Sequence, residues 1–308
     1  MMRFSVESWA PDRSGPLPGD VLDPSDAAVN IDVELPLAQW RALRADAVEP
    51  APCVLFVDGV RRIDARVWLE APSGGTRLGL CASFAAGVSR CDGRATIAAA
   101  EVRRGLFTSV PTDELITRNG TYQPLLVAGD DESDLILGVQ HRMTELEIEV
   151  AARAGDAELI VVDGPLRGRQ AVVNAIGMVK SHRVSYLPPE AAEVVAALTP
   201  GERTPLFLMT TSWSRFSWYL RLPGGSGHAW AGIVRCEASA DLPVTSVRAA
   251  ADLTAATLPR FASQAHKDPR APQNLYPIAG LERELRRRLG DPGLLERALR
   301  LASATSAA

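Results

Sequence analysis

The hydrophobic pattern in the first third of the chain predicts several β-strands. Residues 53–59, CVLFVDG, form a short continuous apolar run ending in Asp-Gly, which is typical of a strand buried on both faces. Apolar and polar residues alternate over 63–69, and further strands are expected over 77–84 and 95–101. Gly59 and a later Ser-Gly-Gly sequence favour turns, so these strands are expected to pair as antiparallel hairpins.

The pattern changes to a helical period over 130–154. Apolar residues recur there at steps of three and four, which indicates an amphipathic helix that begins at Asp131 or Ser133 and ends near Gly155. The next segment, AELIVVDGPLRG, is a second apolar strand, and it ends in Asp163 followed by glycine. Three antiparallel strands, a helix and a strand that joins the first one in the sheet are typical of a ribonuclease H-like fold. The apolar stripe of the helix consists of Leu135, Val139, Met143, Leu146 and Val150.

The second half of the chain is expected to add further strands and helices to the same domain. Residues 1–30, rich in Pro, Asp, Ser and Gly, predict an irregular N-terminal arm, and 31–308 a single domain. The expected fold class is α/β, a ribonuclease H-like mixed sheet flanked by helices, with additional antiparallel strands and C-terminal helices. The later elements are expected as helices over 188–198, 244–258, 278–289 and 292–302, and as strands over 216–222 and 229–237.

Composition narrows the functional classes. The 308 residues are 46% hydrophobic and 23% charged, as in ordinary globular proteins, and the net charge of -4 means that any nucleic-acid groove must be a local basic surface. The four cysteines form no C-x-x-C pair, so a zinc site is not expected. No apolar run approaches 18 residues and no signal peptide is evident, so a cytoplasmic protein without a membrane segment is expected.

Two aspartates carry the candidate chemistry. Asp58 and Asp163 each follow an apolar strand, and if these strands are neighbours their carboxylates meet at the end of the sheet. Such carboxylates repel one another unless a cation lies between them, and Mn²⁺ or Mg²⁺ suits an all-oxygen site. Two such ions about 4 Å apart can stabilise the attacking and leaving oxygens in phosphodiester hydrolysis. The structural alternative is that each Asp-Gly pair is simply a turn.

A third carboxylate is expected from the helix between the two aspartates. Glu145 is preferred because it adjoins Met143 and Leu146 at the edge of the apolar stripe. Glu149 is second, since residues four apart share a helix face. Glu147 is expected to point elsewhere, although a small rotation of the helix would change this order.

A series of short motifs then resembles a known family. FVDGVRR, RMTELEIEVA, LIVVDGPLRG, GMVKSHRVSYLP, SWYLRLPG and NLYPIAGLE resemble, in this order, the NurA nuclease domain over about residues 54–289. The resemblance implies a ribonuclease H-like fold and Mn²⁺-dependent cleavage of DNA ends. It also implies a role in DNA repair, a homodimer and a hexameric HerA-type ATPase as partner.

Carried over residue by residue, the resemblance assigns roles to five positions. Asp58 and Asp163 match the family's strand-end metal aspartates, and Glu145 best matches its helix glutamate. Lys180 matches a lysine that could bind the scissile phosphate. Tyr276 matches the tyrosine of the late Tyr-Pro motif.

One position departs from the family pattern. The family places a metal-site histidine a little over two turns after the tyrosine, where this chain has Glu284. Three interpretations stay open: Glu284 is an oxygen ligand, His266 substitutes from the preceding loop, or the site is impaired.

Other charged and aromatic residues have weaker assignments. Four arginines could line a phosphate-binding groove, four aromatic residues could stack on bases or pack in the core, and a late basic helix could bind DNA or a partner. These residues are Arg167, Arg169, Arg183 and Arg221; Trp213, Trp218, Tyr219 and Trp230; and Arg283, Arg286, Arg287 and Arg288.

Two functional hypotheses follow. The first is a metal-dependent deoxyribonuclease that processes DNA ends. The second is a catalytically weakened, dimeric DNA-binding adaptor for a translocating ATPase, which Glu284 at the histidine position favours.

Overall fold

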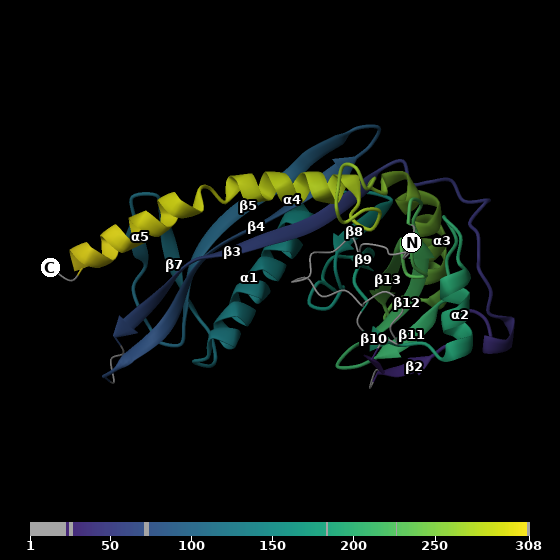
Figure 1. Ribbon diagram of the computed structural model, residues 1–308, viewed down its shortest axis with the longest axis horizontal. Coiled ribbons are helices and arrows are strands. Elements are labelled where there is room, and N and C mark those ends of the chain that lie inside the picture. Colours follow the sequence, from purple (N-terminus) through teal and green to yellow (C-terminus); the bar gives the residue numbers. More distant parts are fainter. Residues whose placement is uncertain (1–22, 25–26, 71–73, 183, 226, 307–308) are drawn as a thin grey trace, which may run out of the picture. The chain divides into compact units, whose positions relative to one another are not determined.

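The computed structural model describes residues 23–24, 27–70, 74–182, 184–225 and 227–306, and Figure 1 labels its helices and strands. The chain forms two compact units from interleaved segments. Unit 1 comprises Met1–Phe56, Arg90–Thr96 and Asp156–Ala279, and unit 2 comprises Val57–Ser89, Ile97–Gly155 and Gly280–Ala308. Because the segments interleave, the single domain expected over 31–308 stays a prediction.

The predicted N-terminal arm falls mostly outside the described residues, which leave out 1–22 and 25–26. Within 1–30, two short strands are described, β1 (Asp23–Pro24) and β2 (Ala28–Asn30). No helix in the described part of the chain has both the length and the apolar character that crossing a membrane requires.

Unit 2 consists of a sheet with helices on both faces (Figure 1). Val60 packs with Leu281 and Leu285 on one face of β3, and Gly59 faces Met143 of α1 on the other. Neighbouring residues of a strand point to opposite faces, which explains this division. The strand order is β3-β4-β5-β7-β6. The elements are β3 (Val54–Glu70), β4 (Thr76–Cys91), β5 (Ala95–Thr108), β6 (Leu115–Thr117), β7 (Gly120–Leu126), α1 (Glu132–Arg153), α4 (Tyr276–Arg288) and α5 (Pro292–Ser306).

The turn expected at Gly59 is wrong, because β3 continues as one strand of 17 residues through the two segments predicted separately. A Cβ atom at Gly59 would lie 2.6 Å from Glu147 Oε1 and 2.9 Å from Met143 Cγ. Glycine is therefore needed for the close approach of α1 to β3 and not for a turn. The other expected turn does contain glycines with positive φ, Gly74 at 86° and Gly75 at 80°.

A buried carboxylate joins three parts of unit 2. The Asp64 side chain is fully buried and accepts hydrogen bonds from Ser83 Oγ, from Tyr122 Oη at 3.0 Å and from Arg62 Nε at 2.8 Å. We expect Asp64→Ala to lower the free energy of unfolding by about 3 kcal/mol, because it leaves buried donors without an acceptor. Urea unfolding measures this, with the exposed Asp130→Ala as a control that should change stability by less than about 0.5 kcal/mol. Equal stability of the two variants would contradict the assignment.

Unit 1 contains a mixed sheet between two helical layers. Its strand order is β2-β11-β12-β13-β9-β8-β3, with β3 represented by residues 54–56. β8 and β9 are parallel, whereas β9, β13, β12, β11 and β2 pair antiparallel in turn. The elements are β8 (Leu159–Asp163), β9 (Ala175–Val179), β10 (Val184–Ser185), β11 (Phe207–Thr210), β12 (Ser214–Arg221), β13 (Ile233–Ser239), α2 (Pro189–Ala197), α3 (Val244–Thr257) and the 3-10 helices Leu37–Gln39 and Leu258–Phe261.

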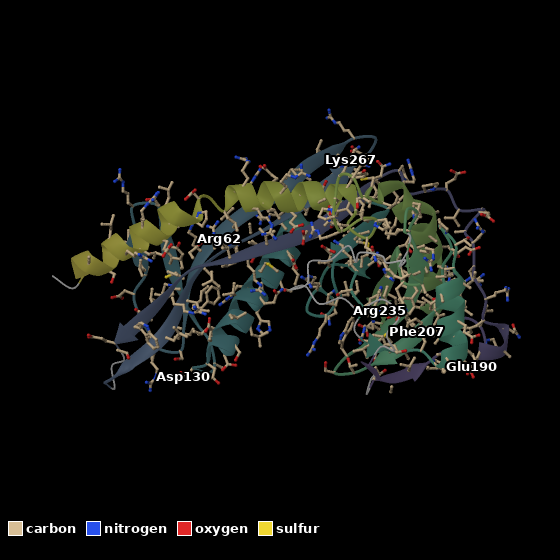
Figure 2. The ribbon with its side chains drawn as sticks, in the orientation of Figure 1. Arg62, Asp130, Glu190, Phe207, Arg235 and Lys267 are labelled. Atoms are coloured by element: carbon tan, nitrogen blue, oxygen red, sulfur yellow. The ribbon has the colours of Figure 1, made fainter. Side chains whose placement is uncertain are left out.

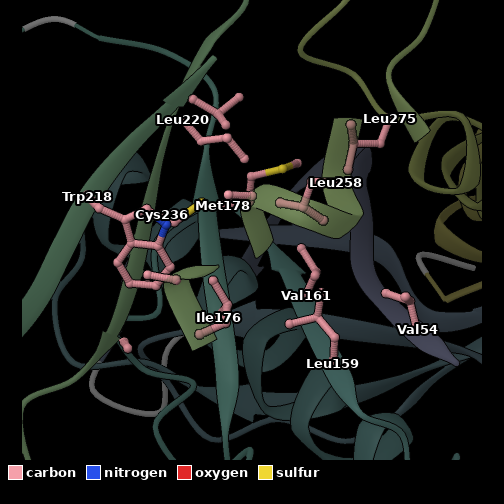
Figure 3. Close-up of a cluster of buried hydrophobic side chains, with 14 of the residues drawn as sticks. Val54, Leu159, Val161, Ile176, Met178, Trp218, Leu220, Cys236, Leu258 and Leu275 are labelled. Carbon is pink, nitrogen blue, oxygen red and sulfur yellow. The ribbon is translucent and has the colours of Figure 1, made fainter. Parts of the chain in front are cut away.

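The main core of unit 1 lies between its sheet and α3. Figure 3 shows Met178, Trp218 and Cys236 from three neighbouring strands in this cluster, together with Leu258 and Leu275. A second cluster covers the other face, where Phe207 and Tyr219 pack against α2. Successive side chains of a strand point to opposite faces of the sheet. Because helices cover both faces, the strands carry apolar residues on both.

The expected fold class is confirmed. β3, β4 and β5 are neighbours in the sheet, α1 follows along the chain, and β8 then lies next to β3, in the ribonuclease H-like succession that the sequence predicts. The additional antiparallel strands and the C-terminal helices α4 and α5 are also present.

Candidate active site

The site is built from the carboxyl ends of two parallel strands. Asp163 is the last residue of β8, and Lys180 directly follows β9, so parallel pairing brings both to the same edge of the sheet. Lys180 Nζ lies 2.7 Å from Asp163 Oδ2. The lysine side chain is only 7% exposed, whereas that of Asp163 is 22% exposed. A buried ammonium thus stands beside a carboxylate that solvent can reach.

Two further side chains hold this lysine. Lys180 Nζ donates to Asn274 Oδ1 at 2.9 Å, and Asn274 Nδ2 donates to Asp268 Oδ2 at 2.7 Å. Asn274 is fully buried and Asp268 nearly so. The other oxygen of Asp268 accepts the backbone N–H of Arg270 at 2.7 Å. This series of hydrogen bonds fixes the position of the ammonium, because each buried donor or acceptor in it has a specific partner.

Asn274 and Asp268 are functional candidates that the sequence analysis missed. Asn274 begins the NLYPIAGLE motif, so the sequence does contain a signal for this residue. Tyr276 is the first residue of α4, two residues after Asn274, and is 37% exposed. Lys267 Nζ lies 5.6 Å from the centre of the Tyr276 ring.

Asp58 belongs to unit 2 and lies within β3, not at its end. Its side chain is largely buried, and its Oδ1 accepts the backbone N–H of Gly59 at 2.8 Å. On the α1 side of the same strand, the Glu147 carboxylate rests against the Gly59 backbone. Asp58 is thus a buried acid of β3 itself, and Glu147 is a buried acid of α1 that packs against the next residue of the strand.

The expected orientation of the helix glutamates is wrong. Glu147 is 1% exposed and faces the sheet. Glu145 is exposed and pairs with Arg142 at 2.8 Å. The reason is helical geometry: Glu147 is four residues after Met143 and shares its face, whereas Glu145 is two residues away and points about 200° around the helix.

Glu149, the second choice for the third carboxylate, is also on the solvent side. Its carboxylate binds Arg103 from β5, with Glu149 Oε1 at 3.0 Å from Arg103 Nη1. The hydrogen bond from Arg103 lowers the pKa of Glu149. Its present role is a surface ion pair, and a ligand role for Glu149 or Glu145 stays a prediction.

The two substitutes for the family histidine occupy different environments. Glu284 lies in α4 and binds Arg287 and Arg288 of the same helix, each at 2.8 Å. Hydrogen bonds from these arginines lower its pKa to about 2. His266 lies exposed in a turn of unit 1, two residues before Asp268. To serve as a ligand, Glu284 would have to release its arginines.

Most of the other arginines and aromatic residues have structural roles. Arg221 donates to the carbonyl oxygens of Ala231, Ala196 and Ala229, and Arg169 is buried. Trp218 and Tyr219 are core residues, and Trp230 packs on Tyr219, as their alternative interpretation predicts. Arg183 lies outside the described residues. In α4, Arg286 pairs with Glu282, and Arg287 and Arg288 pair with Glu284.

The side chains present fit one hard divalent ion better than a cage made of protein ligands alone. Among the residues that the structure describes, no three His, Cys, Asp or Glu side chains form a group that could hold a metal ion. Mg²⁺ commonly needs only one or two carboxylates, because water and substrate phosphates supply the remaining oxygens. Asp163 meets this requirement, since its carboxylate is an oxygen donor open to solvent.

Comparison with known proteins places the chain in a family. No curated protein matches it. One family model, described as the NurA domain, matches residues 78–286, which is more than half of the 308 residues. The match contains Asp163, Lys180 and Tyr276 and begins after Asp58. The chain therefore belongs to the NurA domain family, a family of nucleases.

Proposed function

We propose that this protein is a divalent-metal-dependent deoxyribonuclease that hydrolyses phosphodiester bonds at DNA ends. The observation that carries the proposal is the contact of Asp163 with the buried Lys180 at the shared edge of two parallel strands. Membership of the NurA family supports nuclease chemistry. A carboxylate that binds a cation and an ammonium that binds a phosphate are the two groups such a reaction needs.

In this proposal, Asp163 is the metal ligand at the end of β8, and Asp58 and Glu147 are further candidate ligands. Glu147 replaces Glu145 in this role because it is the buried glutamate of α1. Mn²⁺ or Mg²⁺, when bound, supplies Lewis-acid polarisation and an activated water. Asp58 and Glu147 belong to unit 2 and Asp163 to unit 1, so each side chain is assigned and tested separately.

Lys180 has a distinct role in the proposed reaction. An ammonium carries three N–H donors, so it can bind a phosphate oxygen while it keeps its contacts with Asp163 and Asn274. Its charge neutralises the negative charge that develops on the phosphate during attack. Asn274 and Asp268 act as positioning residues, because Asn274 accepts a hydrogen bond from Lys180 Nζ and Asp268 in turn holds Asn274.

Family membership also leads us to propose the biological setting. DNA repair is the proposed process, a homodimer the proposed assembly, and a hexameric HerA-type ATPase the proposed partner. These assignments rest on the family.

Cleavage of linear DNA tests the proposed function. The purified protein is expected to cleave single-stranded or double-stranded DNA in Mn²⁺ and to stop when EDTA removes the metal. Asp58→Asn keeps the size of the side chain but removes its charge, and we expect it to reduce the rate at least about 100-fold. Equal cleavage by the two proteins would remove Asp58 from the site. No cleavage by the wild type would reject the nuclease assignment.

Replacement of Lys180 is expected to separate metal binding from catalysis. Lys180→Met removes a cation that competes for Asp163, so the affinity for Mn²⁺ should rise, while the cleavage rate should fall about 100-fold because the phosphate loses its ammonium. Titration calorimetry measures the affinity, and an end-labelled DNA assay measures the rate. A variant that weakens Mn²⁺ binding, or one that cleaves as fast as the wild type, would contradict these roles.

The adaptor function is supported by a separate observation. Glu284 stands at the family's histidine position and is held by two arginines, which lower its pKa to about 2. A protein of this kind would bind DNA in Mn²⁺ without cleaving it. A gel-shift measurement beside the cleavage assay therefore distinguishes the two functions.

A further inference from the structure

Unit 1 contains a cavity of about 540 Å³ beside β9. Val179 and Ser181, the two neighbours of Lys180, line this cavity, whereas Lys180 and Asp163 do not. The volume lies in the range of about 300–1,000 Å³ that small-molecule sites have in proteins. The cavity is therefore a second site, distinct from the contacts between Asp163 and Lys180.

The wall of the cavity carries more positive than negative charge. Arg215 and Arg235 are 6% and 5% exposed, and both bind the same atom, Glu237 Oε1, at 3.0 and 2.9 Å. The second oxygen of Glu237 accepts the backbone N–H of Leu166 at 3.0 Å. Arg167 adds an exposed guanidinium. Two buried guanidiniums thus share one carboxylate, and an unbalanced buried charge is costly unless an anion accompanies it.

Apart from the shared Glu237, the described acceptors of the two buried guanidinium groups are neutral. Arg235, labelled in Figure 2, directs Nη1 at the sulfur of Met209 at 3.1 Å, and a thioether is a weak acceptor. Arg215 Nη1 reaches Thr211 Oγ1 at 3.2 Å. Each guanidinium has five N–H donors in a planar fork that matches the oxygens of a phosphate group. A phosphate would satisfy donors that these contacts leave poorly used.

Two aromatic rings accompany the arginines. The guanidinium carbon of Arg215 lies 5.0 Å from the centre of the Trp213 ring, and that of Arg235 lies 4.9 Å from the centre of the Tyr186 ring. Trp213 and Tyr186 both line the cavity and are half-buried. An aromatic ring of this kind can stack on a planar base, and such stacking contributes about 1–3 kcal/mol per base.

We propose that this cavity binds a nucleoside monophosphate without a metal ion, with the phosphate at Arg215 and Arg235 and the base against Trp213. This rests on the proposed function in one respect: the cavity adjoins Lys180, so its natural ligand would be a released nucleotide or the terminal nucleotide of a strand. The phosphate and the base are the same in both sources.

Titration calorimetry with deoxyadenosine monophosphate in EDTA tests the proposal, because EDTA removes any contribution from a metal site. The wild type is expected to bind the nucleotide, and deoxyadenosine or inorganic phosphate at least about tenfold more weakly. A 5′-phosphorylated oligonucleotide that binds equally well identifies a strand terminus as the ligand, and one that does not identifies the free nucleotide. Either result supports the site. No binding of the nucleotide, or equal binding of phosphate alone, would overturn the assignment.

Matched variants locate the site. Arg235→Gln leaves Glu237 paired with Arg215, so the fold should persist, and Trp213→Leu removes only the stacking surface. Each is expected to weaken nucleotide binding at least tenfold. Arg41→Gln, at an exposed arginine of unit 1 that does not line the cavity, should leave nucleotide binding unchanged. Unchanged binding by Trp213→Leu would place the nucleotide elsewhere. Asp163→Asn should bind the nucleotide as the wild type does, because Asp163 does not line the cavity. A failure of the nuclease assignment is therefore distinguishable from a failure of the nucleotide site.

Discussion

Asp163→Asn is expected to lower Mn²⁺-dependent DNA cleavage about 10³-fold, which corresponds to about 4 kcal/mol of transition-state stabilisation. Asparagine has almost the same size and retains an oxygen that can accept the hydrogen bond from Lys180, so the end of β8 should keep its conformation. The change removes only the negative charge that a divalent ion requires. The measurement is the initial rate on end-labelled linear DNA at saturating Mn²⁺.

A matched control separates this effect from a loss of surface charge. Asp156 is an exposed aspartate of unit 1, seven residues earlier, and Asp156→Asn should cleave at the wild-type rate. Circular dichroism of both variants should coincide with that of the wild type. If Asp163→Asn keeps more than a tenth of the wild-type rate, Asp163 is not a metal ligand and its carboxylate serves only to hold Lys180.

Glu147→Gln is expected to lower the cleavage rate about 100-fold. Glu147 is the buried glutamate of α1 and rests against the backbone of Gly59, the residue after Asp58. Carboxylate oxygens are preferred ligands of Mg²⁺, so a Glu147 that ligates the ion would lose its contribution when glutamine removes the charge. Glutamine preserves the volume of the side chain, so a loss of rate reports the charge. The rate is measured per folded protein, because a purely structural role would lower stability and leave that rate unchanged.

The neighbouring glutamate provides the control for this prediction. Glu145 is exposed and pairs only with Arg142 on the same helix in the contacts described, so Glu145→Gln should retain the wild-type rate. The two substitutions lie two positions apart in one helix and make the same chemical change. The opposite order, with Glu145→Gln inactive and Glu147→Gln active, would restore the original assignment of the third carboxylate.

The elements with a strong hydrophobic period were predictable from the sequence. The apolar stripe of α1 and the apolar run of β8 identified both elements close to their observed bounds. The same stripe also contained the signal for Glu147, since this residue is four positions after Met143. Adjacency to Leu146 along the chain was a poorer guide than the helical angle.

The continuity of β3 and the contacts of Lys180 were not predictable in the same way. Gly59 suits both a turn and a tightly packed strand, and only the approach of α1 decides between them. Asn274 and Asp268 come about 90 residues after Lys180 along the chain and lie in an irregular segment without periodicity. The motif marks Asn274 itself, but its contact with Lys180 is set by tertiary packing, so no local pattern pairs the two residues.

Direct Mn²⁺ binding tests the central claim that acidic side chains hold a catalytic cation. Electron paramagnetic resonance detects free Mn²⁺ during a titration, so the bound fraction can be compared between the wild type and Asp163→Asn without any DNA. We expect the wild type to deplete the free-ion signal at sub-millimolar Mn²⁺ and Asp163→Asn to bind the ion at least about tenfold more weakly. Identical titration curves for the two proteins would contradict it.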